Sequence, residues 1–548
     1  MQLPKKISDN LHFLIVEVRH HLNSLNAYFD THADKFKNQI SQRNGYVYNL
    51  KMGIHNSCLS HYTEQNLTGF EHVSLKSIEL IATNLERITD ICRVCIEKSS
   101  AIKKQYFHLT DELTQLIKQV ENSLYLIEPA IFEGLTESAI KIGHVKKKID
   151  KKCTLLMEES ISLLKQETDT ESLIAFLFVI NEFEHIAEKL LNISEAIISA
   201  NLGHSINFER YFFLQLSIEQ LKEEQNTPQD ANILVETIAQ TRSGSAISGL
   251  SLDKEKNQYL AIYKDGKKHK LKKERKGIKS WHDIYPGIAP KVLNYHKQGQ
   301  SASLLIEHLD GLTFEQILIT SSSELLKKAL KQLNKTLQNI WLKSKSEQGS
   351  KAHFMQQLLH RLDDVYAVHP EFINAQETIG KYQATSFAEL VEQAKKIEAQ
   401  IAVPFAVYIH GDFNLDNIIY QPEQKRINFI DLHRSKYMDY VQDVSVFMVS
   451  NYRMQILDTP IRHKILSLAY SFYCFARKFA KKQNDETFEL RLALGLARSF
   501  VTSTRFILDK SLARAMFYRS RYIIEQVIKA DLTQPKQFKL AIEDIFVG

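Results

Sequence analysis

The chain has 548 residues, of which 44% are apolar and 24% are charged, and its formal net charge is +6. This ordinary globular composition excludes a fibrous or largely disordered protein, and so small a charge argues against a nucleic-acid binder. The length exceeds what one hydrophobic core can serve, so we expect two or three domains. Five scattered cysteines, and no uninterrupted apolar stretch of about 18 residues, predict a cytoplasmic protein without a membrane span.

The first 205 residues have the pattern of a helical bundle. They contain only two prolines, and glycine-free runs at 73–100 and 172–201 carry apolar residues at helical spacing. We expect the second run to stop at Gly203, because glycine readily takes the left-handed conformation that closes a helix. Residues 206–230 contain a further amphipathic segment and then a polar stretch, and we assign them to a linker.

Two pairs of acidic residues repeat within this helical part. Glu184 and Glu188 follow Glu86 and Asp90 at a distance of 98 positions (184 minus 86). Each pair shares one helix face, and its repulsion calls for a bound cation or a basic partner. The motif resembles the PhoU-like phosphate-regulator family, which implies paired three-helix bundles, a metal site at these carboxylates and a protein partner. Glu188 departs from the family's usual Asp, so a structural or partner-binding acidic stripe is the alternative.

Beyond the linker the pattern changes to short β-rich runs at 233–238, 259–263 and 303–306. Helical patterns then return and continue to the end, with two short strand-like runs between them. This order predicts a small strand-rich lobe at 231–309 and a large helical lobe at 310–548. The expected fold is therefore multidomain, with an all-α bundle followed by an α+β bilobal unit.

The most informative segment is residues 410–419, which read His-Gly-Asp-Phe-Asn-Leu-Asp-Asn-Ile-Ile and precede a short strand that ends in Asp431. Phosphoryl transfer needs a carboxylate near the attacking hydroxyl, and oxygen ligands that hold magnesium on the nucleotide phosphates. Asp412 provides the first, and Asn417 and Asp431 provide the second. Because a tight loop and the end of the next strand meet at one rim, we expect these three side chains to converge.

This pattern resembles the aminoglycoside phosphotransferase and choline kinase group, which has a protein-kinase-like fold. The resemblance implies that Asp412 is the catalytic base, that Asn417 and Asp431 bind magnesium, and that ATP is the donor. It also implies that Asp443 supports the loop rather than taking part in the chemistry. We expect His410 to brace the same loop through hydrogen bonds.

The resemblance extends to nucleotide contacts in the strand-rich lobe. Lys264 ends a strand and is expected to reach the α and β phosphates, and Glu274 to orient it from a helical segment. A competing lysine within 267–270, or a solvated charge run, is the alternative. A loop rich in glycine and serine lies ahead of this lysine, and a segment that joins the lobes follows the last strand. The residues expected to bind the nucleotide are Ser245, Ser248, Lys264, Glu274, Glu307 and Leu309.

The helical end of the chain is rich in basic residues, among them Arg453, Arg498 and Arg505. Aminoglycosides are polycations that are usually met by acidic clefts, so this composition argues against such a substrate. If these side chains face the cleft, they favour an anionic small-molecule acceptor, whereas a solvated helix face is the alternative.

The predicted function is the ATP- and magnesium-dependent transfer of a phosphate to a hydroxyl of a small molecule, under regulation by the helical bundle. A second hypothesis is a regulatory adaptor that binds nucleotide as a switch and contacts a protein partner through the bundle, which the irregular glycine loop favours. A protein kinase is disfavoured, because no recognisable activation segment follows Asp431.

Overall fold

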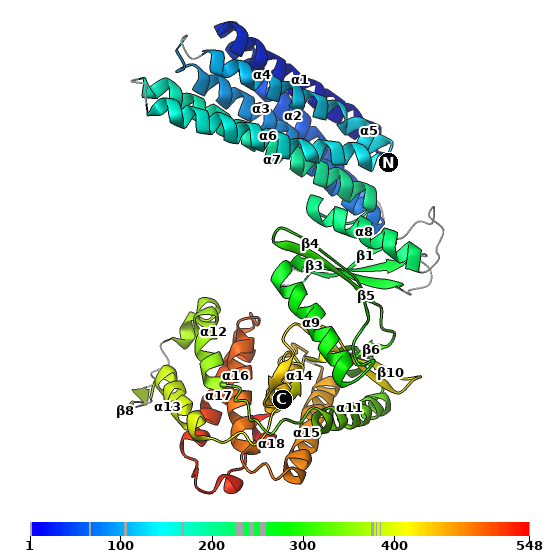
Figure 1. Cartoon of the computed structure of the whole chain (residues 1–548), viewed down its shortest axis with the longest axis vertical. Helices are drawn as coiled ribbons and strands as arrows, with labels where there is room; N and C mark the ends of the chain where they lie inside the picture. The colour runs from blue at the N-terminus through cyan, green and yellow to red at the C-terminus, as the bar shows by residue number, and fades with distance from the viewer. Residues whose placement is uncertain are drawn as a thin grey trace. The chain divides into compact units, whose positions relative to one another are not determined.

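A computed structural model describes residues 3–64, 67–103, 107–165, 169–224, 234–240, 246–251, 259–373, 378–379, 381–383, 385–456 and 458–546 (Figure 1). These residues form two compact units, one with the described residues up to 251 and the other with those from 259 onward. The fold class expected from the sequence is confirmed, since a helical bundle comes first and an α+β unit follows. The finer domain limits given above stay predictions.

The described part of the first unit is dominated by eight helices. They are α1 (Lys5–Thr31), α2 (Asp34–Glu64), α3 (Gly69–Ser99), α4 (Phe107–Tyr125), α5 (Ile127–Phe132), α6 (Thr136–Leu164), α7 (Thr170–Leu202) and α8 (Phe208–Glu224). A capping box begins α3, where the Thr68 hydroxyl accepts from the Glu71 backbone and the Glu71 carboxylate accepts from the Thr68 N–H at 2.8 Å. The predicted stop after α7 is confirmed, because Gly203 closes the helix with a φ of 74°.

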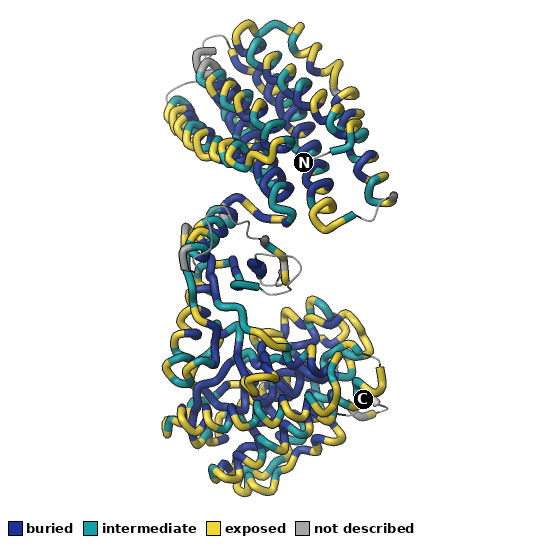
Figure 2. The backbone as a smooth tube through the Cα atoms, turned by 90° about the vertical axis from the view of Figure 1, so that its right-hand side faces the viewer, coloured by how far each residue is buried: buried dark blue, intermediate teal, exposed yellow. Residues whose placement is uncertain are grey.

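These helices pack as two three-helix bundles, α1 with α2 and α3, and α4 with α6 and α7. The two bundles join where α3 packs against α7 (Figure 1). Ile88 of α3 and Ile186 of α7 hold equivalent positions in the repeated motif, and both are fully buried. Buried residues follow the inner sides of the helices and exposed residues their outer sides (Figure 2). Two strands, β1 (Leu234–Gln240) and β2 (Ala246–Ser251), complete this unit and pair antiparallel.

The second unit begins with three antiparallel strands, β3 (Ala261–Lys267), β4 (Val292–Gln298) and β5 (Ser301–Glu307), with β5 in the middle. One helix, α9 (Lys268–Ile284), follows β3 directly and packs on all three strands. Its buried face, which includes Leu271, Ile278 and Trp281, has the spacing of an amphipathic helix on a sheet. This helix and the three strands form the layer that carries Lys264 on β3 and Glu274 on α9.

The larger part of the second unit is helical, with short strands between the helices. Its elements are β6 (Leu312–Thr313), α10 (Phe314–Thr320), α11 (Ser323–Lys343), α12 (Phe354–Val368), η2 (Pro370–Phe372), β7 (Thr378–Ile379), β8 (Tyr382–Gln383), α13 (Phe387–Gln400), β9 (Val407–Ile409), η3 (Leu415–Asn417), β10 (Ile418–Gln421), β11 (Arg426–Phe429), β12 (Lys436–Met438), α14 (Val441–Tyr452), α15 (Thr459–Lys482), α16 (Phe488–Thr504), α17 (Lys510–Ile528), η4 (Pro535–Gln537) and α18 (Ile542–Ile545). Two small antiparallel sheets, β11-β10-β6 and β12-β9, lie among these helices.

An aromatic core supports these two small sheets. Phe413 and Phe429 are fully buried and contact each other edge to face, with ring centroids 5.4 Å apart. Phe447 of α14 and Phe472 of α15 extend the cluster, with centroids 4.1 Å apart. The strands that carry the predicted catalytic loop are therefore anchored on a rigid apolar base. Within the described part of the chain, no helix is both long and apolar enough to cross a membrane.

Candidate active site

The predicted catalytic loop lies between two strand ends, as the sequence indicated. It leaves β9 at Ile409 and enters β10 through the short turn η3, and the hairpin of β10 and β11 then brings the chain back to Asp431. The backbone N–H of Ile430 donates to the carbonyl oxygen of Asn417 at 3.0 Å. This bond holds the two metal-ligand candidates, Asn417 and Asp431, on adjacent segments.

Asp412 and Asn417 are tied together within the loop. The side-chain amide of Asn417 donates to the backbone carbonyl of Asp412 at 2.9 Å, and the amide of Asn414 donates to the Asp412 carboxylate at 3.0 Å. The Asp412 side chain is 20% exposed, and its second carboxylate oxygen lies 3.4 Å from an Arg434 guanidinium nitrogen. A base candidate that is partly exposed and held by an amide is thus presented to solvent in a defined orientation.

Asp443 holds the loop from beneath, which matches the supporting role expected for it. Its two carboxylate oxygens accept the backbone N–H groups of His410 and Gly411 at 2.7 and 2.8 Å. Burial raises its pKa to about 7, against the effect of these hydrogen bonds. Gly411 has a φ of 83°, and a Cβ there would lie 2.5 Å from the Arg434 carbonyl oxygen. A glycine is therefore required where the loop turns over this carboxylate.

His410 braces the loop, as expected. One ring nitrogen accepts from the backbone N–H of Asp412 at 3.3 Å, so the other donates to the carbonyl of Ile430 at 2.9 Å. Burial lowers the pKa of His410 to about 4. The imidazole is consequently neutral at physiological pH, and it links the two segments that carry Asp412 and Asp431.

Asp431 stands at the end of the hairpin with a φ of 58°, a conformation that is uncommon outside glycine and is found at functional sites. Its carboxylate contacts His433 Nδ1 at 2.9 Å. Burial alone would raise its pKa, but His433, Lys264 and Lys270 outweigh burial and lower it. Asp431 is therefore ionised across the physiological range, as a cation ligand must be.

Lys264 and Glu274 form the pair that the sequence predicted. The ammonium nitrogen of Lys264 on β3 lies 2.5 Å from a carboxylate oxygen of Glu274 on α9, and the two side chains are 9% and 2% exposed. Burial would lower the pKa of Lys264, but Glu274 and Asp431 raise it above its usual value. The lysine thus interacts electrostatically with Asp431, which ends the catalytic hairpin.

A close approach of α9 to the segment after Asp431 fixes this arrangement. A Cβ at Gly277 would lie 2.2 Å from the backbone oxygen of Leu432, so only glycine fits where the helix crosses this segment. One turn further along α9, the indole N–H of Trp281 donates to the Ser435 hydroxyl at 2.8 Å. The helix that orients Lys264 is therefore fastened to the loop that carries Asp431.

A cleft of about 2040 Å³ is lined by Asp412, Asn417 and Asp431, whereas Lys264 and Glu274 are not among its lining residues. The carboxylate of Asp431 and the side-chain oxygen of Asn417, whose N–H group is already used, are the oxygen ligands that magnesium prefers. The donor set therefore fits a magnesium ion, which Asn417 and Asp431 would hold.

The wall of this cleft is basic, which bears on the arginines noted in the sequence. Three of them, Arg453, Arg498 and Arg505, line it. Among the described residues that line the cleft, nine are Lys or Arg and five are Asp or Glu. They are Lys273, Lys276, Lys351, Arg361, Arg434, Lys436, Arg453, Arg498 and Arg505, against Glu315, Asp364, Asp412, Asp416 and Asp431.

The remaining nucleotide candidates are less closely defined. Ser245 lies outside the described residues, and Ser248 is a buried residue of β2 that pairs with Thr237 of β1 in the first unit. Glu307 ends β5, and its carboxylate accepts the backbone N–H of Lys291 at 3.0 Å. Leu309 follows it, half-buried, in the segment between β5 and β6. The nucleotide contacts of these four residues stay predictions.

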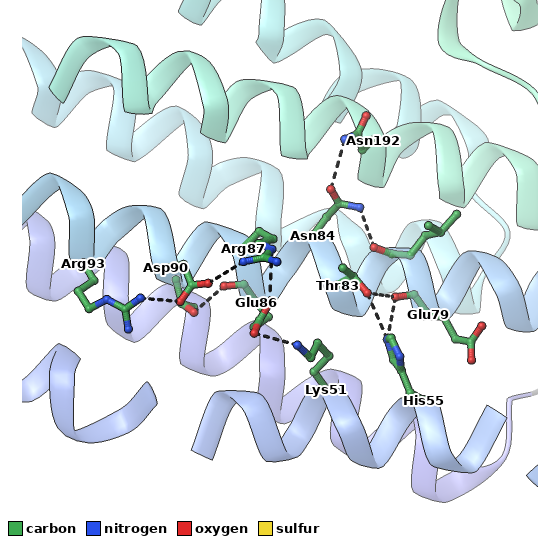
Figure 3. A network of polar contacts seen from close by, with 12 residues as sticks. Lys51, His55, Glu79, Thr83, Asn84, Glu86, Arg87, Asp90, Arg93 and Asn192 are labelled. Carbon is green, nitrogen blue, oxygen red and sulfur yellow. Dashed lines mark hydrogen bonds and ion pairs between the residues drawn. The ribbon is translucent and has the colours of Figure 1, made fainter. Parts of the chain in front are cut away.

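In the helical bundle, basic side chains surround the first acidic pair (Figure 3). Glu86 is 2.9 Å from Lys51 Nζ, and Asp90 is 3.2 Å from Arg87 and 3.1 Å from Arg93. This is the basic-partner alternative that the sequence left open.

The second acidic pair lies on α7. Glu184 is half-buried, and the exposed Glu188 lies 3.8 Å from His185. Across the described residues, no group of three or more His, Cys, Asp or Glu side chains is placed to hold a metal ion. A metal at either pair stays a prediction.

Sequence reasoning missed two residues of the site, His433 and Arg434. They lie two and three positions after Asp431 and contact Asp431 and Asp412, respectively. Their position next to a predicted metal ligand was the signal that could have found them.

Part of the second unit matches a known protein family. Residues 320–466 match the model of the ecdysteroid kinase-like family, and this span contains Asp412, Asn417, Asp431 and Asp443 but not Lys264. No curated protein matches the chain.

Several solved structures are similar to parts of the chain. PhoU from Streptococcus pneumoniae is 17% identical over 37% of this chain and 96% of that chain, with a TM-score of 0.35. An aminoglycoside phosphotransferase from Streptomyces rimosus, solved with ADP and streptomycin, is 18% identical over 52% and 98%, with a TM-score of 0.33. Choline kinase from Cryptosporidium parvum is 13% identical over 60% and 99%, with a TM-score of 0.38.

At these identities and TM-scores, none of these structures assigns an activity to the chain. The family match includes the catalytic loop and the hairpin that follows it, in which the sequence resembles small-molecule kinases. Within the second unit, residues 320–466 are thus similar to the ecdysteroid kinase-like family.

Proposed function

We propose that the second unit is an ATP- and magnesium-dependent phosphotransferase that phosphorylates a hydroxyl of a small molecule other than an aminoglycoside. The observation that carries this proposal is the convergence of Asp412, Asn417 and Asp431 on one cleft. The buried pair of Lys264 and Glu274 adds the phosphate-binding lysine that such an enzyme requires.

Each residue has a distinct role in the proposed reaction. When bound, ATP would supply the γ-phosphoryl group and leave as ADP, and magnesium would neutralise the charge that develops on the transferred group. Asn417 and Asp431 hold the cation, and Lys264, kept in place by Glu274, contacts the phosphates. Asp412 orients the acceptor hydroxyl and accepts its proton.

The helical bundle is proposed to regulate this activity through a protein partner, in line with its sequence motif. Four of the five cysteines are buried and all five are free thiols in the structure, which supports the proposed cytoplasmic location.

A nucleotide-binding adaptor is the second candidate, and one observation favours it. Both carboxylate oxygens of Asp412 already have partners, Asn414 and Arg434, so the base could be held in a resting state. Calorimetry that shows ATP binding with no magnesium-dependent turnover would support the adaptor.

The test of the enzyme is a phosphotransfer screen, in which the full chain is incubated with magnesium, labelled ATP and pools of hydroxyl-bearing metabolites. We expect magnesium-dependent label transfer, which Asp412→Asn lowers by about 10²- to 10⁴-fold because it removes the proton acceptor. Asp363→Asn, an exposed carboxylate on α12 outside the cleft, is the matched control and should retain activity. Equal activity of Asp412→Asn and the parent would refute the proposal.

A further inference from the structure

Arg498 on α16 is a buried cation at the wall of the cleft. It is 8% exposed, and its Nε and Nη2 atoms have no hydrogen-bond partner among the residues that the structure describes. The next residue, Ser499, is 3% exposed, and its hydroxyl is likewise without a partner in this part of the chain. Both residues line the cleft that Asp412 and Asp431 share. A buried guanidinium without a partner costs folding free energy, so its retention calls for a ligand.

Three carboxylates, Asp412, Asp443 and Glu398, act electrostatically on Arg498, but their oxygens have other partners. Those of Asp412 are Asn414 and Arg434. Asp443 accepts the two backbone N–H groups of the catalytic loop. Glu398 accepts the backbone N–H groups of Phe354 and Met355 at 2.5 and 3.0 Å, and so caps α12. Burial lowers the pKa of Arg498 to about 10, although Asp412 and Asp443 oppose this effect. The side chain therefore remains a cation at physiological pH.

The guanidinium of Arg498 lies beside an aromatic ring and forms no ion pair among the described residues. Its guanidinium carbon lies 5.7 Å from the centre of the Phe354 ring, which provides a flat surface beside it. Arg505, two helical turns further on, also lines the cleft, and its Nε is another buried donor with no partner in the described chain. One of its other nitrogens lies 3.3 Å from Asp364, so this second guanidinium is only partly compensated.

We propose that Arg498, Ser499 and Arg505 form a subsite for an oxyanion of the acceptor, a phosphate monoester or a carboxylate, apart from the hydroxyl that is phosphorylated. The inference rests on the proposed function for the identity of the cleft, and it adds the substrate class. A guanidinium fork matches the geometry of two oxygens of either group. The serine hydroxyl donates a further hydrogen bond to the same anion. Acceptors of this class are hydroxylated acids or sugar and polyol phosphates.

The test titrates inorganic phosphate, and separately acetate, onto the full chain without nucleotide, with sodium chloride at equal ionic strength as the reference. Binding is followed by calorimetry and by the shift of Tm. We expect one of the two anions to bind and to raise Tm above the chloride reference, and Arg498→Met to weaken its binding by about 10- to 100-fold. Tighter binding of phosphate identifies a phosphate monoester as the natural group, and tighter binding of acetate identifies a carboxylate.

Two further variants keep the test decisive. Arg477→Met removes a partly exposed arginine of α15 that is paired with Glu489 outside the cleft, and it should bind anions as the parent does. Arg498→Lys keeps the charge but loses the fork, and it should bind with intermediate affinity, which covers the case in which Arg498→Met does not fold. Anion binding that is unchanged by both Arg498 variants, or absent from the parent, would overturn the subsite. Because no nucleotide is present, these results are independent of whether the chain transfers phosphate.

Discussion

Two polar clusters of this chain differ in whether their buried charges form ion pairs within the protein. In the bundle, Glu86 and Asp90 lie against Lys51 and two arginines, so acidic and basic groups compensate each other within the protein (Figure 3). In the cleft, Arg498 keeps two buried nitrogens without a partner among the described residues. The charge of Glu86 is balanced by Lys51 and Arg87, although its Oε2 accepts no hydrogen bond in the described chain, whereas the Arg498 guanidinium forms no ion pair there and has capacity for a ligand. The same residue types therefore indicate architecture in one unit and binding in the other.

The contrast recurs within a single helix, α16. Arg491 is buried and contacts both Asp439 and Asp485. Burial alone would lower its pKa, but these two carboxylates raise it. Arg498 lies seven residues later on the same helix and lines the cleft. It forms no ion pair with a carboxylate of the described chain. Two buried arginines of one helix, one ion-paired and one not, can therefore be compared by their contributions to the free energy of unfolding.

The largest difference between the two arginines is expected when each is replaced in turn. Arg491→Met leaves two buried carboxylates without their cation, and we expect it to lower the free energy of unfolding by about 3–5 kcal/mol. Arg498→Met removes a charge that has no partner in the described chain, so we expect no loss, or a gain of about 1 kcal/mol. Urea unfolding without added anions measures both. Equal losses would show that Arg498 is a structural residue and that the two halves of the helix do not differ.

The next test concerns the acidic side of the cleft. Asp431→Asn removes a cation ligand, and we expect magnesium-dependent transfer to fall by about 10²- to 10³-fold, because the phosphates lose the ion that neutralises them. The side chain is 29% exposed, so stability should change little. Turnover measured against magnesium concentration, beside Asp363→Asn, checks this. Full activity at ordinary magnesium concentrations would place the cation elsewhere.

A third test probes the support beneath the loop through its pH dependence. The pKa of His410 is about 4 in the folded chain and 6.5 in its ordinary state, so between these values the unfolded chain binds the extra proton. The stability that comes from the neutral imidazole is therefore present above pH 6.5 and is lost as the pH falls toward 4.

The size of this effect is set by the pKa difference, which corresponds to about 3 kcal/mol. We expect the free energy of unfolding of the parent to fall by that amount relative to His410→Asn across the same pH range. Denaturant titrations of both proteins at several pH values measure the difference. A constant difference between the two proteins would mean that the histidine is not desolvated as described.

The sequence was sufficient for those parts of the site that lie close together in the chain. Asp412, Asn417 and Asp431 fall within one loop and one hairpin, so their convergence follows from local geometry. Lys264 and Glu274 lie at the end of a strand and in the helix that directly follows it. The helical bundle was equally accessible, because its repeat places Ile88 and Ile186 in equivalent register.

The rest depends on packing between distant segments. Many basic residues near the end of the chain look alike in sequence, and only the packing of α16 decides that Arg498 is buried at the cleft while Arg491 meets two carboxylates. Likewise, Lys51 is 35 positions from Glu86, on another helix. The local sequence therefore does not distinguish a buried charge that forms an ion pair from one that does not.

The smallest expected effect concerns the compensated cluster of the bundle. Lys51→Met leaves the Glu86 carboxylate, which is 9% exposed, without its nearest cation, and we expect a loss of about 1–2 kcal/mol in the free energy of unfolding. Glu86→Gln combined with Lys51→Met should recover most of this loss, because the buried charge is then gone. Urea unfolding of the three proteins measures the coupling between the two side chains.

The same proteins decide between the basic-partner and metal-site alternatives for this motif. If Lys51 is the partner of Glu86, manganese or zinc should leave the Tm of the parent unchanged, because the ammonium group already occupies the position that a cation would take. Lys51→Met leaves the Glu86 carboxylate without its ammonium partner. If the motif can bind a metal, manganese or zinc should raise the Tm of this variant. A metal-dependent rise of Tm in the parent, lost in Glu86→Gln, would reverse the assignment and make this cluster, like the cleft, a site for a ligand.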